Sequence, residues 1–501
     1  MRSTFMGLET NKRGMFTQQS GLYTVGHNIS NANTIGYSRQ RVNMEATTPY
    51  PGIGLNSGTT PGFIGTGVQA HSIQRIRDTF VDRQYRQESN NFGYWETRSK
   101  AISQMEDVMA EPSEFGLNET LNQFWKSLED LSTHPENAGA RRVVVERGIA
   151  TATSFNYMHK QLSDIQSNLK NEIRISTDRT NSIFKQIADL NNQIQKIEPN
   201  GYMPNDLYDA RDMLLDELST YFPIEVVPVP TGGNSKAIAE GSVTVSILTS
   251  TGKIEVVKGK EFTTMASNLS AMDTYEDFTQ FTFSPTANLV GGTINHGDLV
   301  QDKGKMLSLV NSYGYGGDQG VYPEMLKNLN DLAVAFANEF NAVHRAGYEF
   351  DSATQAGDFF EPTTGAGDIK VLDVIKSDPN KIGASLAADE EGNGKNAILL
   401  ANIQSKAFNI GGTSSTIQTF YQSVIGKLGV DGQQAIRMEF NSATLSLAVE
   451  NRRSSISSVS LDEEMTDMIK FQQAYNASAR MITVVDETLD RIINSMGRVG
   501  Q

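Results

Sequence analysis

Histidine, serine and acidic side chains are the residues best suited to catalysis or metal binding. Their spacing in this sequence predicts neither a catalytic site nor a metal site. The six histidines never stand three or four residues apart, so no helical turn brings two of them to one metal ion. The chain has no HExxH, P-loop or GxSxG sequence, and it has no cysteine to serve as a thiolate ligand or nucleophile. The sequence therefore predicts no catalytic residue, no cofactor and no metal ion.

Three further segments could suggest a site, and each has a simpler interpretation. "DSATQAGD" carries carboxylates suited to calcium but not at EF-hand spacing. "GIGLNSG" is glycine-rich but lacks the strand-to-helix context of a dinucleotide site, so we interpret it as a flexible turn. Asp462, Glu463 and Glu464 follow Ser460 in a capping-box pattern, so we expect first-turn acids favoured by the helix dipole rather than an acid–base pair.

The stretch "VGHNISNANTIGYSRQ", residues 25–40, concentrates asparagine and serine, which compete with helical hydrogen bonding. We interpret it as a joint, in which asparagine adopts left-handed geometry to stop a helix and Gly36 makes a second turn. "YSRQRV" then leaves as an extended arm, with Arg39 and Arg41 available to acids on a neighbouring subunit. A plain surface loop is the alternative.

Length and charge limit the class of protein. A chain of 501 residues exceeds one ordinary core, so we expect two to four domains. The net charge of −15 argues against nucleic acid or an anionic membrane as the main partner. No apolar run reaches the length of a membrane span, and the N-terminus has no apolar core typical of a Sec signal peptide. The arginine-bearing stretch Arg75, Arg77, Arg83 and Arg86 is interrupted by acids and predicts a solvated face.

Both ends of the chain carry apolar residues at alternating steps of three and four, the pattern of a coiled coil. The N-terminal stripe is Phe5, Leu8, Met15, Leu22 and Ile29, and the C-terminal stripe is Leu461, Met465, Met468, Tyr475, Ala479, Ile482, Leu489, Ile493 and Met496. We expect the two terminal helices to pair, with the rest of the chain as an insertion between them. Helices of this length are marginal alone, so the pair needs neighbours.

Between the termini the pattern predicts a helical body with a β-rich insertion. Residues 149–198 contain no glycine or proline and predict one long helix. "LNQFWKSLEDLSTHPENAGARRVVVERG" predicts two helices broken at His134-Pro135, and Gly347 is expected as the C′ residue that ends another. "IQTFYQSVIGKLG" and residues 435–449 predict two more. Short alternating segments such as "SVTVSILTS" predict strands with Val243, Val245 and Ile247 inward and Thr244 and Ser246 facing water.

The predicted fold class is α+β, mainly α, in an elongated chain of several domains. We expect a terminal coiled-coil domain (residues 1–60 and 455–501), a helical body (61–221 and 301–454) and a β-rich insertion (222–300). Residues 348–395, which include strand-like "DIKVLDVI", are expected to form a mixed region with a β-hairpin.

These motifs resemble those of bacterial flagellar rod, hook and hook-associated proteins. "GLYTVGHNISNANTIGYSRQRV" resembles their N-terminal signature, and "SVSLDEEMTDMIKFQQAYNASARMITVVDETLDRIINSM" is similar to their C-terminal segment. "NTIGYSRQRV", "LNQFWKSLEDLSTHPENAGARR" and "LAVAFANEFNAVHRAGYEF" resemble the hook-associated members. The resemblance covers both ends and most of the body, and the β-rich insertion matches only in character.

The resemblance implies a secreted structural subunit, not an enzyme, at the hook–filament junction. Implied partners are other copies in a ring or helical layer, the hook protein, the next hook-associated protein and a flagellar export chaperone, with no nucleic acid and no membrane insertion. Implied export is through the flagellar type III apparatus without a cleaved signal. The expected axial assembly interface is Leu8, Met15, Leu22, Ile29, Asn31, Asn33, Gly36, Tyr37, Arg39, Leu461, Met465, Met468, Tyr475, Ala479, Ile482, Leu489 and Ile493. The expected chaperone-binding residues are Tyr475, Ile482, Val485 and Leu489.

Other functions remain open at this point. A hook or rod subunit would share the terminal motifs, although rod proteins are usually shorter and the middle of hook proteins is mainly β. An axial protein carrying a hydrolase domain would need clustered carboxylates, which the β-rich insertion does not show. A surface adhesin with coiled-coil ends would leave "NANTIGYSRQ" unexplained.

Overall fold

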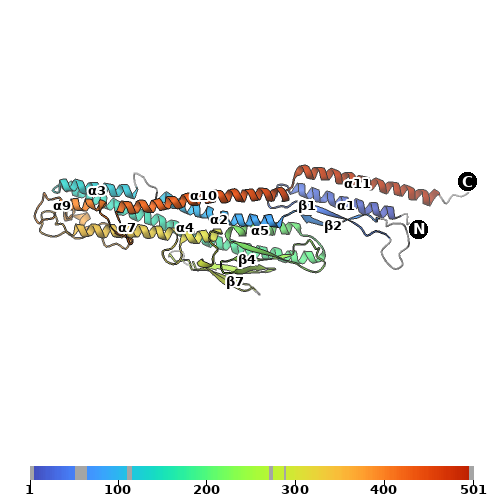
Figure 1. The fold of residues 1–501 in the computed structure, drawn as a ribbon, viewed down its shortest axis with the longest axis horizontal. Coiled ribbons are helices and arrows are strands. Elements are labelled where there is room, and N and C mark those ends of the chain that lie inside the picture. The colour runs from blue at the N-terminus through green and yellow to red at the C-terminus, as the bar shows by residue number, and fades with distance from the viewer. Residues whose placement is uncertain (1–4, 51–64, 110–115, 270–274, 287–288, 496–501) are drawn as a thin grey trace.

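The computed structural model describes residues 5–50, 65–109, 116–269, 275–286 and 289–495, and it shows a long, narrow molecule (Figure 1). Helices α1 (Phe5–Ser30) and α11 (Leu461–Asp490) lie side by side at one end, where both termini are found. The other helices form a bundle that extends to the opposite end, with a β-sheet against its middle.

The chain is mainly helical, as predicted. The remaining long helices are α2 (Thr79–Val108), α3 (Leu117–Thr133), α4 (Ala138–Ile197), α5 (Asn205–Tyr221), α7 (Val321–His344) and α10 (Ile417–Ser457). Shorter helices are α6 (Lys305–Tyr313), α8 (Asp373–Ser377) and α9 (Lys395–Ala401). None of the helices in the described part of the chain is long and apolar enough to span a membrane.

The predicted long helix is present and is longer than expected. Helix α4 has 60 residues, which at 1.5 Å per residue is roughly 90 Å. It begins at Ala138 because the side chain of Asn137 accepts hydrogen bonds from the N–H groups of Gly139 and Ala140. The second of the two helices expected around His134-Pro135 is therefore the first part of α4.

Two helices predicted near the C-terminus are in fact one. Helix α10 runs without interruption through Gly426, Gly429 and Gly432, and it includes both predicted segments. Gly432 lies against α2, where an added Cβ would be 2.4 Å from Glu106 Oε1. Long-range packing along α2 therefore overrides the low helix propensity of glycine.

The six-stranded sheet is antiparallel, in the order β3-β4-β5-β6-β7-β8. Its strands are β3 (Ile224–Val229), β4 (Ser242–Leu248), β5 (Lys253–Lys258), β6 (Glu261–Ser267), β7 (Gln280–Pro285) and β8 (Gly292–Asn295). Thr244 and Ser246 are buried, so the prediction that they face water was wrong. The reason is that β4 is an inner strand packed near α4, where Asn191 exchanges hydrogen bonds with the backbone of Val243.

The predicted β-hairpin in residues 348–395 is absent from that segment. Only single β-bridges occur there, such as Phe360 to Val371, and α8 follows at once. Gly347 was also interpreted wrongly. Its φ is not positive, and it is required by close contact instead, since an added Cβ would lie 2.3 Å from Asn396 Nδ2.

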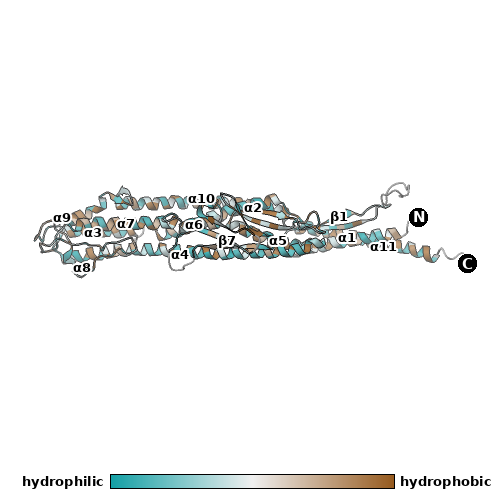
Figure 2. Cartoon of the chain, turned by 90° about the horizontal axis from the view of Figure 1, so that it is seen from below, coloured by the Kyte–Doolittle hydropathy of each residue, from teal (hydrophilic) through white to brown (hydrophobic). Residues whose placement is uncertain are grey.

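Two short antiparallel hairpins complete the fold. Strands β1 (Gln40–Ala46) and β2 (Val68–Arg75) pair beside α1, and β9 (Phe408–Ile410) pairs with β10 (Thr413–Ser415) just before α10. Polar and apolar residues alternate along α10 and α11, where brown residues recur over the length of both helices (Figure 2).

Candidate functional site

Helices α1 and α11 pack through a line of glycines. Gly7, Gly14 and Gly21 stand seven residues apart on α1. A Cβ added to each would lie 3.8 Å from Val485 Cγ2, 3.4 Å from Ser478 Oγ and 3.1 Å from the Phe471 ring, respectively. Each step of seven up α1 is matched by a step of seven down α11, so the helices are antiparallel and in heptad register. We call this contact line the glycine seam.

The glycine seam passes through residues that the apolar pattern did not select. On α11 the structure buries Leu489 and half-buries Met468, Tyr475, Ala479 and Ile482, but it leaves Leu461, Met465 and Ile493 exposed. On α1, Leu8, Met15, Leu22 and Ile29 are half-buried and Phe5 is exposed. Met496 lies outside the described residues. A search for glycine at heptad spacing would have found the seam, because glycine lets two helix backbones approach closely.

Asn28, seven residues after Gly21, ends the seam with a polar contact. Its Nδ2 donates to the Gln40 carbonyl oxygen at 2.8 Å and to Glu464 Oε2 at 3.0 Å. Its Oδ1 accepts from the Gln40 N–H at 3.0 Å and from the Tyr37 hydroxyl at 2.8 Å. One buried amide therefore connects α1, the start of β1 and the first turn of α11.

Arg39 completes this joint within the same chain. Its Nε donates to Glu464 Oε1 at 2.6 Å, its Nη1 donates to Glu463, and its backbone N–H donates to the Ser457 carbonyl oxygen at the end of α10. Burial lowers the pKa of Arg39, but the two carboxylates raise it by more, so its pKa lies above the ordinary value. The expectation that Arg39 meets acids of a neighbouring subunit is therefore not what this chain shows. Arg41 is exposed on β1.

The acidic residues in the first turn of α11 make different contacts from those predicted. The side chain of Ser460 makes no capping hydrogen bond, so the predicted capping box is absent. Glu464 is buried and instead receives Arg39 and Asn28. Glu463, the N3 acid of the predicted capping box, is paired with Arg39 Nη1 instead.

The turn between α1 and β1 depends on glycine rather than asparagine. Asn31 ends the helix with its backbone N–H and side-chain amide both donating to the His27 carbonyl oxygen. None of the asparagines between residues 28 and 36 has a positive φ, so the left-handed geometry expected for them was wrong. Gly36 has a φ of 79°, so a side chain at this position would strain the backbone, and its Cβ would lie 2.3 Å from Met213 Sδ. Asn33 is exposed in this turn.

A buried ionic network connects this joint to the body. Ser38 donates from its N–H and its hydroxyl to Asp209, which also receives Arg75 Nη1 at 2.6 Å. Arg75 and Arg77 lie 2.9 and 3.0 Å from Asp212. Despite its burial, these arginines lower the pKa of Asp212.

The interpretation of this arginine stretch as a solvated face was therefore wrong for most of its members. Arg86 also pairs inward, with Asp216 Oδ1 at 2.8 Å, and only Arg83 of the four is exposed. The missed signal was Asp209, Asp212 and Asp216 at helical spacing on α5, which places three acids on one face.

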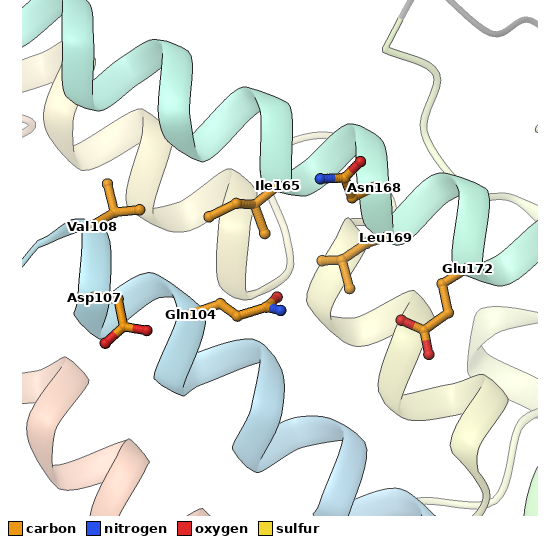
Figure 3. A pocket seen from close by; sticks show the side chains of 7 residues that line it. All are labelled: Gln104, Asp107, Val108, Ile165, Asn168, Leu169 and Glu172. Carbon is orange, nitrogen blue, oxygen red and sulfur yellow. The ribbon is translucent and has the colours of Figure 1, made fainter.

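A depression of about 320 Å³ lies between α2 and α4 (Figure 3). It is lined by Gln104, Asp107, Val108, Ile165, Asn168, Leu169 and Glu172. Glu172 is paired with Lys305 Nζ at 2.9 Å, and Asp107 is the other ionisable side chain of the lining. Among the described residues no three histidine or acidic side chains gather as metal ligands.

The comparisons with known proteins agree on one family. Residues 102–360 match the family model of the flagellar hook-associated protein FlgK helical domain, and residues 451–496 match that of the flagellar basal body rod FlgEFG protein C-terminal region. The chain is 43% identical over 517 residues to flagellar hook-associated protein 1 of Bacillus subtilis (strain 168), with both chains covered in full. It is 25% identical over 551 residues to flagellar hook-associated protein 1 of Escherichia coli (strain K12), covering 96% of this chain and 98% of that one.

A solved structure has the same fold. The flagellar hook junction protein FlgK from Burkholderia pseudomallei superposes with a TM-score of 0.59 at 12% identity, over 75% of this chain and 100% of that chain. At that identity the likeness concerns the fold alone. The full-length identity to the Bacillus subtilis protein carries the assignment, and the chain belongs to the flagellar hook-associated protein 1 (FlgK) family.

Proposed function

We propose that this chain is a structural subunit of the bacterial flagellum that forms the hook–filament junction, the layer at the distal end of the hook on which the filament is built. The observation that carries the proposal is the glycine seam, which holds the two termini together as a straight antiparallel pair at one end of the molecule. A straight terminal pair on a long helical body suits a subunit that is stacked along an axis.

We propose that copies contact one another, the hook protein and the next hook-associated protein through the terminal pair. Leu461, Met465 and Ile493 are large apolar residues that α1 leaves exposed on α11, and Phe16 is similarly exposed on α1. Exposed apolar residues on both helices favour burial against further helices. Asn28, Tyr37 and Arg39 then act within each copy, by setting how the pair leaves the body.

We propose secretion through the flagellar type III apparatus without a cleaved signal peptide, with a flagellar export chaperone on α11. Absence of cysteine suits a chain that is exported without disulfides to reduce. We also propose that residues 1–60 with 455–501, 61–221 with 301–454, and 222–300 are the three structural units. The contact of α1 with α11 and the separate hydrogen bonding of β3–β8 support that division.

The test is complementation. Loss of the gene should leave cells with hooks but with unassembled filament monomers in the medium, and the intact gene should restore filaments. Filaments on the deletion strain would contradict the proposal. A hook or rod subunit, the alternative suggested by the shared C-terminal segment, predicts instead that hooks themselves are missing.

A further inference from the structure

The chain contains two Asn-Gly dipeptides, Asn200-Gly201 and Asn393-Gly394. An asparagine followed by glycine is prone to spontaneous deamidation, in which the next backbone nitrogen attacks the side-chain amide. Glycine favours this reaction because it has no Cβ to hinder the approach and leaves the backbone flexible. The dipeptides are identical in sequence, but the fold gives them different surroundings.

The fold holds Asn200 in an arrangement that opposes the reaction. Asn200 is the last residue of the short 3₁₀-helix η1 (Glu198–Asn200), and the Gly201 N–H donates to the Glu198 carbonyl oxygen at 2.8 Å. The side chain is also held, because Asn200 Nδ2 donates to the Lys196 carbonyl oxygen at 2.9 Å. An attack by the Gly201 nitrogen would have to break both hydrogen bonds and unwind this turn.

Asn393 lies in the irregular turn that precedes α9 and is only partly buried, so water has access to it. No described residue accepts a hydrogen bond from the Gly394 N–H, so no hydrogen bond within the described chain has to break before this nitrogen attacks. Asn393 Oδ1 accepts from the Lys395 N–H at 3.0 Å. That hydrogen bond closes a ring containing both the Asn393 Cγ and the Gly394 nitrogen, so the side chain is folded toward the nitrogen that would attack it.

The hydrogen bonds of Asn393 also favour the reaction chemically. As the Gly394 nitrogen attacks Cγ, negative charge develops on Oδ1, where the Lys395 N–H already donates and stabilises that charge. Asn393 Nδ2, the nitrogen that leaves, donates to Glu390 Oε2 at 2.7 Å. The Glu390 carboxylate is therefore placed to pass a proton to the leaving nitrogen.

From these observations we infer that Asn393 is a site of spontaneous deamidation in the folded chain and that Asn200 is protected. The Gly394 nitrogen forms a bond to the Asn393 Cγ, the Cγ–Nδ2 bond breaks, and the proton of the Gly394 N–H leaves with Nδ2 as ammonia. Water then opens the resulting succinimide at either carbonyl and leaves aspartate or isoaspartate at position 393. This modification goes beyond the proposed function and does not depend on it.

The products of this reaction alter a crowded part of the body. Gly394 lies against the end of α3, where an added Cβ would be 2.1 Å from the Ser132 carbonyl oxygen. Isoaspartate inserts one carbon into the backbone directly before Gly394, and no space is available there for a longer chain. Either product also places a second carboxylate beside Glu390, which loses the amide donor of Asn393. Modification therefore disturbs the contact of α9 with α3.

The test compares the two dipeptides within one molecule. The full chain is incubated folded in mildly alkaline buffer, digested with trypsin and analysed by mass spectrometry, with a sample taken at the start to correct for deamidation during digestion. The peptide 382–395 has Asn393 as its one asparagine, and the peptide 197–211 contains Asn200. Asn393 should deamidate about ten-fold faster than Asn200 or more, which corresponds to a barrier lower by about 1.4 kcal/mol. Equal rates, or a faster reaction at Asn200, would overturn the inference.

Two controls connect the difference in rate to the fold. In urea the hydrogen bonds of both sites are lost, so Asn200 and Asn393 should react at similar rates, and a rate ratio as large as in the folded chain would overturn the inference. Asn393→Gln should abolish the mass increase of the peptide 382–395 and leave Asn200 unchanged, because the ring that glutamine must close is one atom larger and forms far more slowly. A mass increase that persists in this variant would overturn the assignment to Asn393.

Discussion

Glu464 is a carboxylate whose side chain is only 2% exposed, so its charge is compensated almost wholly by Arg39 and Asn28. Arg39→Met should destabilise the pairing of α1 with α11 by about 3 kcal/mol, because removing one member leaves a buried charge without its partner. Hydrogen–deuterium exchange should show amides of the first turns of α11 exchanging about 100-fold faster. Unchanged exchange would mean that solvent compensates Glu464.

A matched control for that substitution lies on α1. Arg13 pairs with Glu9 at 3.1 Å, but both side chains are about half exposed. Arg13→Met should therefore change the exchange of α11 by less than a factor of five, as expected for a surface ion pair worth under about 1 kcal/mol. Arg39→Met with Glu464→Gln should recover part of the loss, because the buried charge is then absent.

His344 predicts a pH dependence for the body. It lies fully buried among Phe340 and Phe359, with Nδ1 donating to the Gly357 carbonyl oxygen and Nε2 accepting from the Gly383 N–H. Burial lowers the pKa of His344 to about 4. The unfolded chain therefore binds a proton below about pH 6.5 that the folded chain does not, and folding stability falls as the pH drops from 6.5 toward 4.

Because of His344, the free energy of unfolding should fall by about 2 kcal/mol between pH 7 and pH 5. His344→Gln lacks the titrating group, so its free energy of unfolding should fall by that much less over the same interval. Urea unfolding of both proteins at the two pH values measures the difference, which cancels the contribution of all other groups. Identical pH dependence in the two proteins would show that His344 is protonated in the folded state.

At the scale of elements, the glycine seam predicts a large effect of a small substitution. Gly21→Val would place a branched side chain where a Cβ alone is 3.1 Å from the Phe471 ring, so α1 and α11 must separate. Gly26 is the control, since no atom lies within 4 Å of its Cβ and Gly26→Ala should stabilise α1 by about 1 kcal/mol. In circular dichroism melts, the unfolding midpoint should fall for Gly21→Val and rise for Gly26→Ala. Equal shifts of the midpoint in the two variants would exclude the seam.

Several elements could be predicted from the sequence and several could not, for identifiable physical reasons. The long helix α4 was predictable because its local pattern has no interruption, and the pairing of terminal helices followed from two heptad patterns. The register of α11 against α1 could not be predicted, because the contact line runs through Gly14 and Ser478, which are not part of an apolar pattern. The joint was recognised at residues 28–39, but its partners Glu464 and Asp209 are distant in sequence and only the fold brings them there.

At the scale of the whole molecule, two ends of the chain are held by one joint. Arg39 contacts both the end of α10 and the start of α11, while Ser38 contacts Asp209 in the body. The terminal pair therefore has a defined direction relative to the bundle instead of hanging from two separate linkers (Figure 1). A subunit that is stacked along an axis needs such a rigid connection between its terminal pair and its body.

The same geometry bears on the proposed export chaperone. Val485 contacts the α1 seam at Gly7, and Leu489 is buried, although both are among the expected chaperone-binding residues. A chaperone that uses these side chains must therefore displace α1. The free energy needed to separate α1 from α11 then weakens chaperone binding. Deleting residues 1–30 should tighten chaperone binding at least ten-fold in titration calorimetry, whereas Ile175→Asp, on the distant body, should leave it unchanged. Equal affinity with and without α1 would place the chaperone on the exposed side of α11, at residues such as Met465 and Ile469.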